Sequence, residues 1–195
     1  MTPSEAHDSA YTRTPEHDEM VASIYEYLQE HGCPIEFSYR VKGPSAAVKM
    51  YRNSWVECEK MYTGRRSFFA DIAIVQWADD VGTFKDGCRY SHHFLLEVKP
   101  KIYSAGAVLR QVKAQEALIS EWCRELESRE PGEAVWKNQR SARSCVAPVF
   151  SAGDPLLPVF TRMAEADQIY FTWSPDTGLV CPRPVRQVSR EDRHA

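Results

Sequence analysis

Two short apolar segments, each interrupted by an acidic residue, constrain the fold of this chain more than any other feature of its sequence. FFADIAIVQW (residues 68–77) and HHFLLEVKP (residues 92–100) have the β-branched and aromatic content of buried strands. Between them lies ADDVGTFKDGCRYS, which is rich in turn residues. We therefore expect an antiparallel pair of strands with a long connection.

The charges in these segments follow the alternation of a strand. Side chains alternate across a strand, so Glu97 and Lys99 are expected on one face, exposed or lining a cleft, while the apolar residues between and before them face the core. Asp71 interrupts the first segment in the same way. A buried carboxylate costs several kcal/mol unless a cation or metal compensates it, so acids on two neighbouring strands require a reason.

The rest of the chain is a mixture of helices and strands. Thr14 as N-cap, Pro15 and the apolar spacing that follows predict a helix over residues 15–31. A long helix is expected from Ser104 to the Pro131-Gly132 pair. Further expected elements are a strand in SCVAPVF, a short helix over 156–166 and a strand in QIYFTW, whereas residues 35–62 allow a strand over 35–41 and are otherwise undecided.

This order of elements predicts an α/β fold with a central mixed sheet of about four or five strands flanked by helices. The chain has 195 residues, of which 43% are hydrophobic, enough for one substantial core. We expect a single domain over residues 14–182, with flexible segments at 1–13 and 183–195.

Several classes of protein are disfavoured by composition. No apolar run approaches the length of a membrane span, and the N-terminus has neither the basic start nor the apolar stretch of a signal peptide, so a cytoplasmic protein without a membrane partner is expected. The six cysteines are scattered without zinc-type spacing, which indicates reduced thiols.

The net charge of −3 argues at first against a nucleic-acid partner, but the charges are unevenly distributed. Residues 1–31 hold seven of the 27 acids and one of the 24 Lys and Arg residues. The remainder is therefore mildly basic, which permits phosphate contacts without predicting them.

Two carboxylates on adjacent strands suggest a divalent metal. Asp71, Glu97 and a backbone carbonyl such as that of Val98, together with waters, form the kind of oxygen site that suits Mg²⁺ or Mn²⁺. Lys99 would orient the attacking water or neutralise charge that develops on a phosphate. This combination indicates hydrolysis of a phosphodiester.

The pattern of an acid on one strand, a connection, Glu-x-Lys on the next strand, and a helix before and after resembles the PD-(D/E)XK nuclease superfamily. The resemblance covers roughly residues 14–125 and is carried by few positions: Ala70-Asp71 resembles the PD element with Ala in place of Pro, and Glu97-Val98-Lys99 resembles the (D/E)XK element. EVKP before a long helix is similar to the endonuclease subunits of heteromeric transposases. The helix, hairpin and strand order is similar to Holliday-junction resolvases and restriction endonucleases.

The resemblance implies a restriction endonuclease-like core and a Mg²⁺-dependent DNA endonuclease with catalytic Asp71, Glu97 and Lys99. It also implies an acid on the first helix, for which Glu16 is the first candidate and Glu19 the second. Gln111 corresponds to a Gln found on the helix after the Lys strand in several branches, with Gln115 one turn later. In the absence of a recognition domain, target choice would come from DNA shape, a homodimer or a partner protein.

Other residues and readings stay open beside this one. Basic residues near the proposed site are expected phosphate contacts: Arg65, Arg66, Lys101, Arg110 and Lys113. His93 shares the parity of Glu97 and would reach phosphate if that face is open. The alternatives are a weak ion pair of Glu97 and Lys99 on an edge strand, and a catalytically inactive module of the same fold that binds nucleic acid or a protein.

Overall fold

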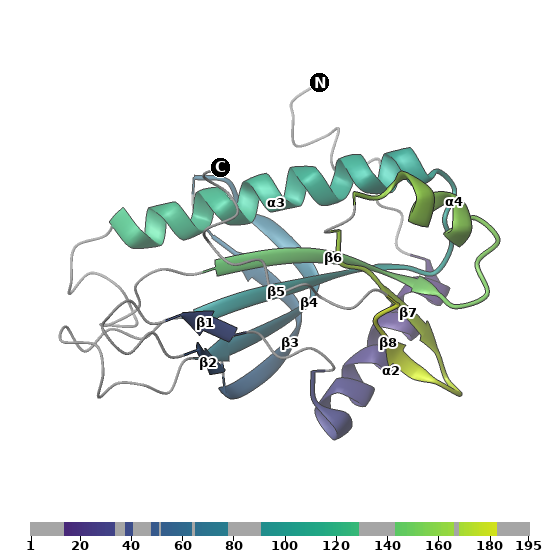
Figure 1. Ribbon diagram of the computed structural model, residues 1–195, viewed down its shortest axis with the longest axis horizontal. Coiled ribbons are helices and arrows are strands. Elements are labelled where there is room, and N and C mark those ends of the chain that lie inside the picture. The colour runs from purple at the N-terminus through teal and green to yellow at the C-terminus, as the bar shows by residue number, and fades with distance from the viewer. Residues whose placement is uncertain are drawn as a thin grey trace.

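The computed structural model describes most of the chain between Thr14 and Pro182 (Figure 1). The described ranges are 14–33, 38–40, 48–50, 52–63, 65–77, 91–128, 143–165 and 168–182. The terminal segments 1–13 and 183–195 expected to be flexible, most of the connection after residue 77 and the expected helix end at Pro131-Gly132 lie outside these ranges.

Helices and strands are interspersed along the chain, which is typical of an α/β fold with a mixed sheet. In order they are α2 (Pro15–His31), β1 (Ser38–Arg40), β2 (Val48–Met50), β3 (Arg52–Tyr62), β4 (Phe68–Trp77), β5 (Ser91–Lys99), α3 (Ala105–Ser128), β6 (Arg143–Ser151), α4 (Leu157–Met163), β7 (Phe171–Ser174) and β8 (Gly178–Val180).

The main sheet has six strands in the order β3-β4-β5-β6-β7-β8. Its first three strands are antiparallel, β5, β6 and β7 are parallel, and β8 returns antiparallel to β7. The expected antiparallel pairing of residues 68–77 with residues 92–100 is confirmed. β1 and β2 form a separate antiparallel pair.

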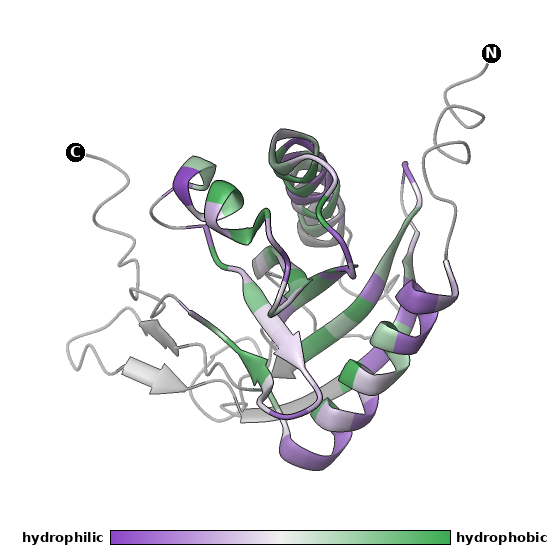
Figure 2. Ribbon diagram, turned by 90° about the vertical axis from the view of Figure 1, so that its right-hand side faces the viewer, coloured by the Kyte–Doolittle hydropathy of each residue, from purple (hydrophilic) through white to green (hydrophobic). Residues whose placement is uncertain are grey.

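Helices cover both faces of the sheet, and each face has its own apolar core. α3 and α4 lie on one face, over a cluster that includes Leu95, Val146 and Phe150. α2 lies on the other face, where Ile24 and Leu28 pack on strand residues that include Leu96. Figure 2, which looks along α3, shows α2 on the opposite side of the sheet. Strands buried on both faces have nearly continuous apolar sequences, which explains why β4 and β5 are the most apolar segments of the chain.

The N-terminal helix forms where its capping signals predict it. The Thr14 hydroxyl accepts a hydrogen bond from the backbone N–H of His17, and Pro15 occupies the first turn, where no N–H is needed. The helix ends at Gly32, whose φ of 77° lies in the region that favours glycine. Local capping contacts therefore set both ends of α2.

The start of α3 is fixed by a buried acid that the sequence does not single out. Asp154 is 8% exposed, and its two carboxylate oxygens accept from the backbone N–H groups of Ile102, at 2.6 Å, and Leu156, at 2.8 Å. These bonds tie the segment between β5 and α3 to the loop between β6 and α4. They therefore set where the first turns of α3 stand relative to the end of β5.

Three strands, β2, β3 and β8, go beyond the sequence prediction, whereas β1 falls within the strand allowed over residues 35–41. β2 and β3 lie in the undecided remainder of residues 35–62, and β3 is an edge strand with charged residues such as Glu57 and Lys60, so it lacks an apolar pattern. β8 is too short to give a periodic signal. Among the described residues, no helix is long and apolar enough to cross a membrane, and the five cysteines within them form no disulfide with one another.

Candidate functional site

The candidate site lies where β4 and β5 separate. Their ladder ends at the pair Ile72↔Leu96, so Asp71 on one strand and Glu97 on the other are the first residues beyond it. From there β4 pairs with β3 alone, through Ala70↔Lys60, while Glu97, Val98 and Lys99 pair with β6. The two acids thus stand at a fork in the sheet.

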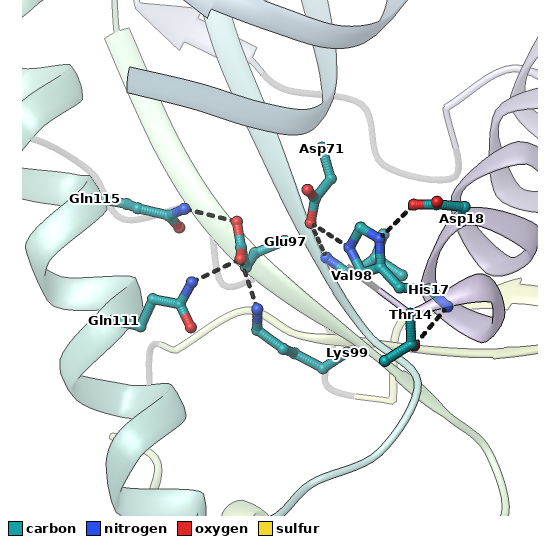
Figure 3. A network of polar contacts seen from close by, with 9 residues as sticks. All are labelled: Thr14, His17, Asp18, Asp71, Glu97, Val98, Lys99, Gln111 and Gln115. Carbon is teal, nitrogen blue, oxygen red and sulfur yellow. Dashed lines mark hydrogen bonds and ion pairs between the residues drawn. The ribbon is translucent and has the colours of Figure 1, made fainter. Parts of the chain in front are cut away.

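Glu97 lies beneath α3 and is held by three side chains (Figure 3). Its Oε1 accepts from Lys99 Nζ at 2.6 Å and from Gln111 Nε2 at 2.7 Å, and its Oε2 accepts from Gln115 Nε2 at 2.6 Å. The face of β5 that carries Glu97 is therefore neither open nor a solvated edge: Glu97 is 2% exposed. Three donors, one of them cationic, offset the cost of burying its charge.

Gln111 and Gln115 are one helical turn apart on α3, so both amides reach the same carboxylate. An ionised carboxylate only accepts, so each amide presents its nitrogen to Glu97. The consequence for Gln115 is that its Oε1 is buried and has no hydrogen-bond partner within the described part of the chain. An amide oxygen left in this state beside a carboxylate is a ready acceptor for a water or ligand for a hard cation.

Asp71 is held from the other face of the sheet. It is 6% exposed, and its Oδ2 accepts from the backbone N–H of Val98 at 2.8 Å and lies 3.3 Å from Nε2 of His17 on α2 (Figure 3). The hydrogen bond from Val98 bridges the fork between the two strands. The hydrogen bond with Asp71 is the main cause that raises the pKa of His17 above its usual value, against the effect of burial.

His17 takes the place on α2 that the sequence assigns to Glu16 or Glu19. Both acids are exposed, whereas His17 shares the buried face with Met20, Ile24 and Leu28. Those residues follow His17 at three, seven and eleven positions, the spacing of one helix face, which the sequence alone would have identified. Glu16 is one residue out of phase with that face.

The strand opposite Asp71 carries a strained residue. The register pairs Cys58↔Ile72 and Lys60↔Ala70, which places Glu59 opposite Asp71. Glu59 has a φ of 51°, in the left-handed region that costs a non-glycine residue about 1 kcal/mol. The backbone irregularity therefore coincides with the point at which the sheet divides.

The expected phosphate contacts are all exposed, but they are spread over the surface. Lys101 lies over the ring of the exposed Tyr103 at 5.4 Å, Arg110 lies on the first turns of α3, and Lys113 forms an ion pair with Glu165. Arg65 and Arg66 lie in the turn between β3 and β4. Arg65, Lys101 and Lys113 contact Glu125, Tyr103 and Glu165, which lie away from Asp71 and Glu97 in the sequence.

His93 does not face phosphate, contrary to the expectation for an open face. It is 4% exposed, its Nδ1 lies 3.1 Å from Tyr62 Oη, and its ring packs edge-on against Trp122. Burial is the main cause that lowers the pKa of His93 to about 3, and Lys60 adds to it. Its role is structural.

We expect this buried histidine to make stability fall as pH is lowered. The pKa of His93 is about 3 in the folded protein and 6.5 in the unfolded chain. Its contribution to the free energy of unfolding is therefore complete above pH 6.5 and is lost as the pH falls from 6.5 toward 3. Between pH 7 and pH 5 the loss is about 2 kcal/mol. Urea unfolding should show a smaller loss for His93→Asn, which keeps an acceptor for Tyr62, and an unchanged loss for the exposed control His31→Gln. Equal losses in all three proteins would contradict the assignment.

Asp71 and Glu97, the acids expected to hold a metal, both follow the last pair of the β4–β5 ladder but do not form a complete cage. Within the described ranges, no group of three or more His, Cys, Asp or Glu side chains is arranged to hold a metal ion. Asp71, Glu97 and the partnerless oxygen of Gln115 supply hard oxygen donors, and Val98, the expected carbonyl ligand, gives its N–H to Asp71. Mg²⁺ characteristically uses one or two carboxylates and completes its shell with water and phosphate, so this donor set fits it.

Comparison of the chain with protein-family models, curated proteins and solved structures gave no match.

Proposed function

We propose that this protein is a Mg²⁺- or Mn²⁺-dependent nuclease that hydrolyses phosphodiester bonds in DNA, with a site of the PD-(D/E)XK type on a restriction endonuclease-like core. One observation carries the proposal: two buried acids on neighbouring strands stand at the point where those strands separate, and a lysine contacts one of them. A sheet stabilised only by apolar packing has no use for such a pair, because each carboxylate must be compensated.

Asp71, Glu97 and the carbonyl of Val98 or the amide oxygen of Gln115 would hold the metal. When bound, the metal would supply Lewis-acid activation of water and of the phosphate. Lys99 brings a cation to the same place, 2.6 Å from Glu97 Oε1, where it can stabilise negative charge on a phosphate. Gln111 and Gln115 fix the orientation of Glu97, and His17 fixes that of Asp71.

DNA is the proposed partner, met in the cytoplasm. Exposed Arg65, Arg66, Lys101, Arg110 and Lys113 would contact phosphates, which position a duplex without reading its sequence. A homodimer or a partner protein would supply target choice.

The test is cleavage of supercoiled, linear and branched DNA by the purified full chain with Mg²⁺, with Mn²⁺ and with EDTA, followed by excess metal added back to the EDTA sample. We expect cutting with either metal, none in EDTA and recovery on addition of metal. Calorimetric titration of Mg²⁺ provides a binding measurement that does not depend on activity. Cutting that persists in EDTA, or no cutting of any of these substrates, would overturn the proposal.

A second candidate function is a non-cleaving module that binds nucleic acid. The observation in its favour is that both acids are nearly inaccessible, at 2% and 6% exposure, and are already held by internal partners. This candidate predicts DNA binding that is the same with and without Mg²⁺, and no cleavage. The metal dependence of cutting therefore separates the two.

A further inference from the structure

The end of the β3–β4 hairpin carries an exposed apolar pair. Met61 and Phe69 are directly opposite each other in the ladder and are 53% and 58% exposed. We call residues 61–63 and 65–69 the β3–β4 arm. Large apolar side chains at this exposure, placed as a cross-strand pair, form a continuous apolar patch rather than single scattered contacts.

The other face of the arm is firmly anchored. Tyr62 and Phe68 alternate with the exposed pair and are 1% and 8% exposed, with their rings stacked at 5.0 Å. Trp122 of α3 meets the Tyr62 ring edge-on at 4.9 Å. The arm is therefore held against α3 through Tyr62, while Met61 and Phe69 are exposed.

The turn of the arm is basic. Arg65 and Arg66 are both exposed, and the sequence from Met61 to Phe69 contains no acidic residue. Glu125 of α3 fixes the turn by accepting from the backbone N–H of Arg65 at 3.2 Å, and lies 3.9 Å from the Nε of its guanidinium. Two arginines next to an apolar pair thus project from one rigid hairpin.

We propose that the β3–β4 arm inserts into a groove of duplex DNA, with Arg65 and Arg66 on the phosphates and with Phe69 and Met61 wedged against a base step that the arm kinks. Rigid two-stranded arms with apolar tips and flanking arginines suit this mode of binding, in which unstacking one step allows more of the backbone to be contacted. The inference rests on the proposed function, and it names the substrate as a duplex that is bent at the site of cutting.

The position of the arm relative to the acids supports this substrate. Asp71 follows Phe69 by two residues on β4, which is about 7 Å along the strand. Successive nucleotides of one DNA strand rise by about 3.4 Å, so a step opened by Phe69 would place a phosphate about two nucleotides away near Asp71. The arm would then decide which phosphate reaches the site.

Charge favours DNA over a second copy of this chain as the occupant. A twofold contact through Met61 and Phe69 would bring two copies of Arg65 and Arg66 together, and Glu125, 3.9 Å from Arg65, would offset their charge only in part. A polyanion meets the same surface with complementary charge.

The experiment uses the full chain in EDTA, where cutting is absent under the proposed mechanism. A labelled duplex reports affinity, 2-aminopurine reports unstacking and end-to-end energy transfer reports bending. We expect Met61→Ser with Phe69→Ser to weaken binding about tenfold and to remove both the 2-aminopurine signal and the bend. Arg65→Gln with Arg66→Gln should weaken binding to all sequences and reduce the salt slope by about 2. Val180→Ser, at another exposed apolar residue, is the matched control and should change nothing.

Each contrary result has a definite meaning. The proposal for the arm is wrong if DNA is still unstacked and bent by the variant with Met61 and Phe69 replaced. It is also wrong if the wild-type protein does not bind duplex DNA at low salt. A change from dimer to monomer by light scattering in the same variant also overturns it, because the pair would then be a subunit contact. If the arm binds and bends DNA that the protein never cuts, the nuclease proposal fails and the proposal of DNA insertion by the arm survives. If the protein cuts DNA and the arm variants cut it equally well, the proposal for the arm fails and the nuclease proposal survives.

Discussion

The Asp71→Asn variant is expected to lose about 10³-fold or more of the metal-dependent cleavage rate while it remains folded. In the proposed mechanism Asp71 is one of two charged oxygen ligands, so its loss takes away charge that the metal needs, and a rate loss of this size corresponds to about 4 kcal/mol in activation free energy. Rates at saturating Mg²⁺ with a supercoiled substrate provide the measurement. Calorimetry on the same variant should show weaker Mg²⁺ binding.

The fold should tolerate this change because the amide can replace both contacts of the carboxylate. Both contacts are made by Oδ2, and the amide oxygen of Asn in the same place can accept from the Val98 N–H and from an Nε2–H of His17. The pKa of His17 should then fall, because its hydrogen bond to an anion is gone. A proton NMR titration of His17 in both proteins checks this.

Glu16→Gln is the matched control for this prediction. Glu16 is an acid on the first turn of the same helix, but it is exposed and lies off the face that reaches Asp71. We expect wild-type cleavage from it. If Glu16→Gln is as inactive as Asp71→Asn, the acid expected from the resemblance acts on the substrate after all; if Asp71→Asn cuts normally, Asp71 is not a ligand.

The sequence predicts the part of this site that depends on the alternation of side chains along β4 and β5. Asp71 and Glu97 interrupt apolar runs, and the antiparallel pairing of those runs brings the two acids to neighbouring strands. The contact of Gln111 with Glu97 follows from a long helix that begins just after β5. These are local patterns joined by one short connection, so the sequence carries them.

What the sequence hides are contacts between distant elements. The spacing of His17 from Met20, Ile24 and Leu28 shows that it lies on the buried face of α2, but its contact with Asp71 depends on how that face packs on the sheet. The burial of His93 depends on Tyr62 and Trp122, which come from an edge strand and a distant turn of α3. Neither packing has a periodic signature.

Glu97→Ala is expected to destabilise the protein by about 3 kcal/mol or more, the second large effect. The substitution leaves Lys99, whose side chain is 15% exposed, and the two glutamine amides without their common acceptor. Breaking a buried ion pair by removing one partner typically costs about 3 to 5 kcal/mol, and the partial exposure of Lys99 favours the lower value because its ammonium can turn toward water. The midpoint of urea unfolding measures the loss.

Glu97→Gln is the matched control. We expect it to lower the free energy of unfolding by only about 1 kcal/mol, because the hydrogen bonds around Glu97 can adapt to it. A glutamine can still accept from Lys99 and Gln111 through its oxygen, while its new amide nitrogen requires an acceptor. Gln115 can provide one by turning its amide over, since its Oε1 is buried without a partner. Glu97→Gln should therefore be folded and inactive, which separates the loss of a ligand from the loss of the fold.

A double-mutant cycle with Lys99→Ala shows whether Glu97 and Lys99 act as a pair. If most of the cost of Glu97→Ala is the stranded ammonium, removing Lys99 as well should recover about 1 to 3 kcal/mol of that loss. The exposed pair of Lys113 and Glu165, 58% and 63% exposed, is the comparison, and its coupling should stay below about 1 kcal/mol. Equal coupling for the two pairs would mean that Glu97 and Lys99 gain nothing from burial. Their place at the fork would then have to be explained by catalysis alone, with Lys99 held ready for the phosphate and contributing little to the fold.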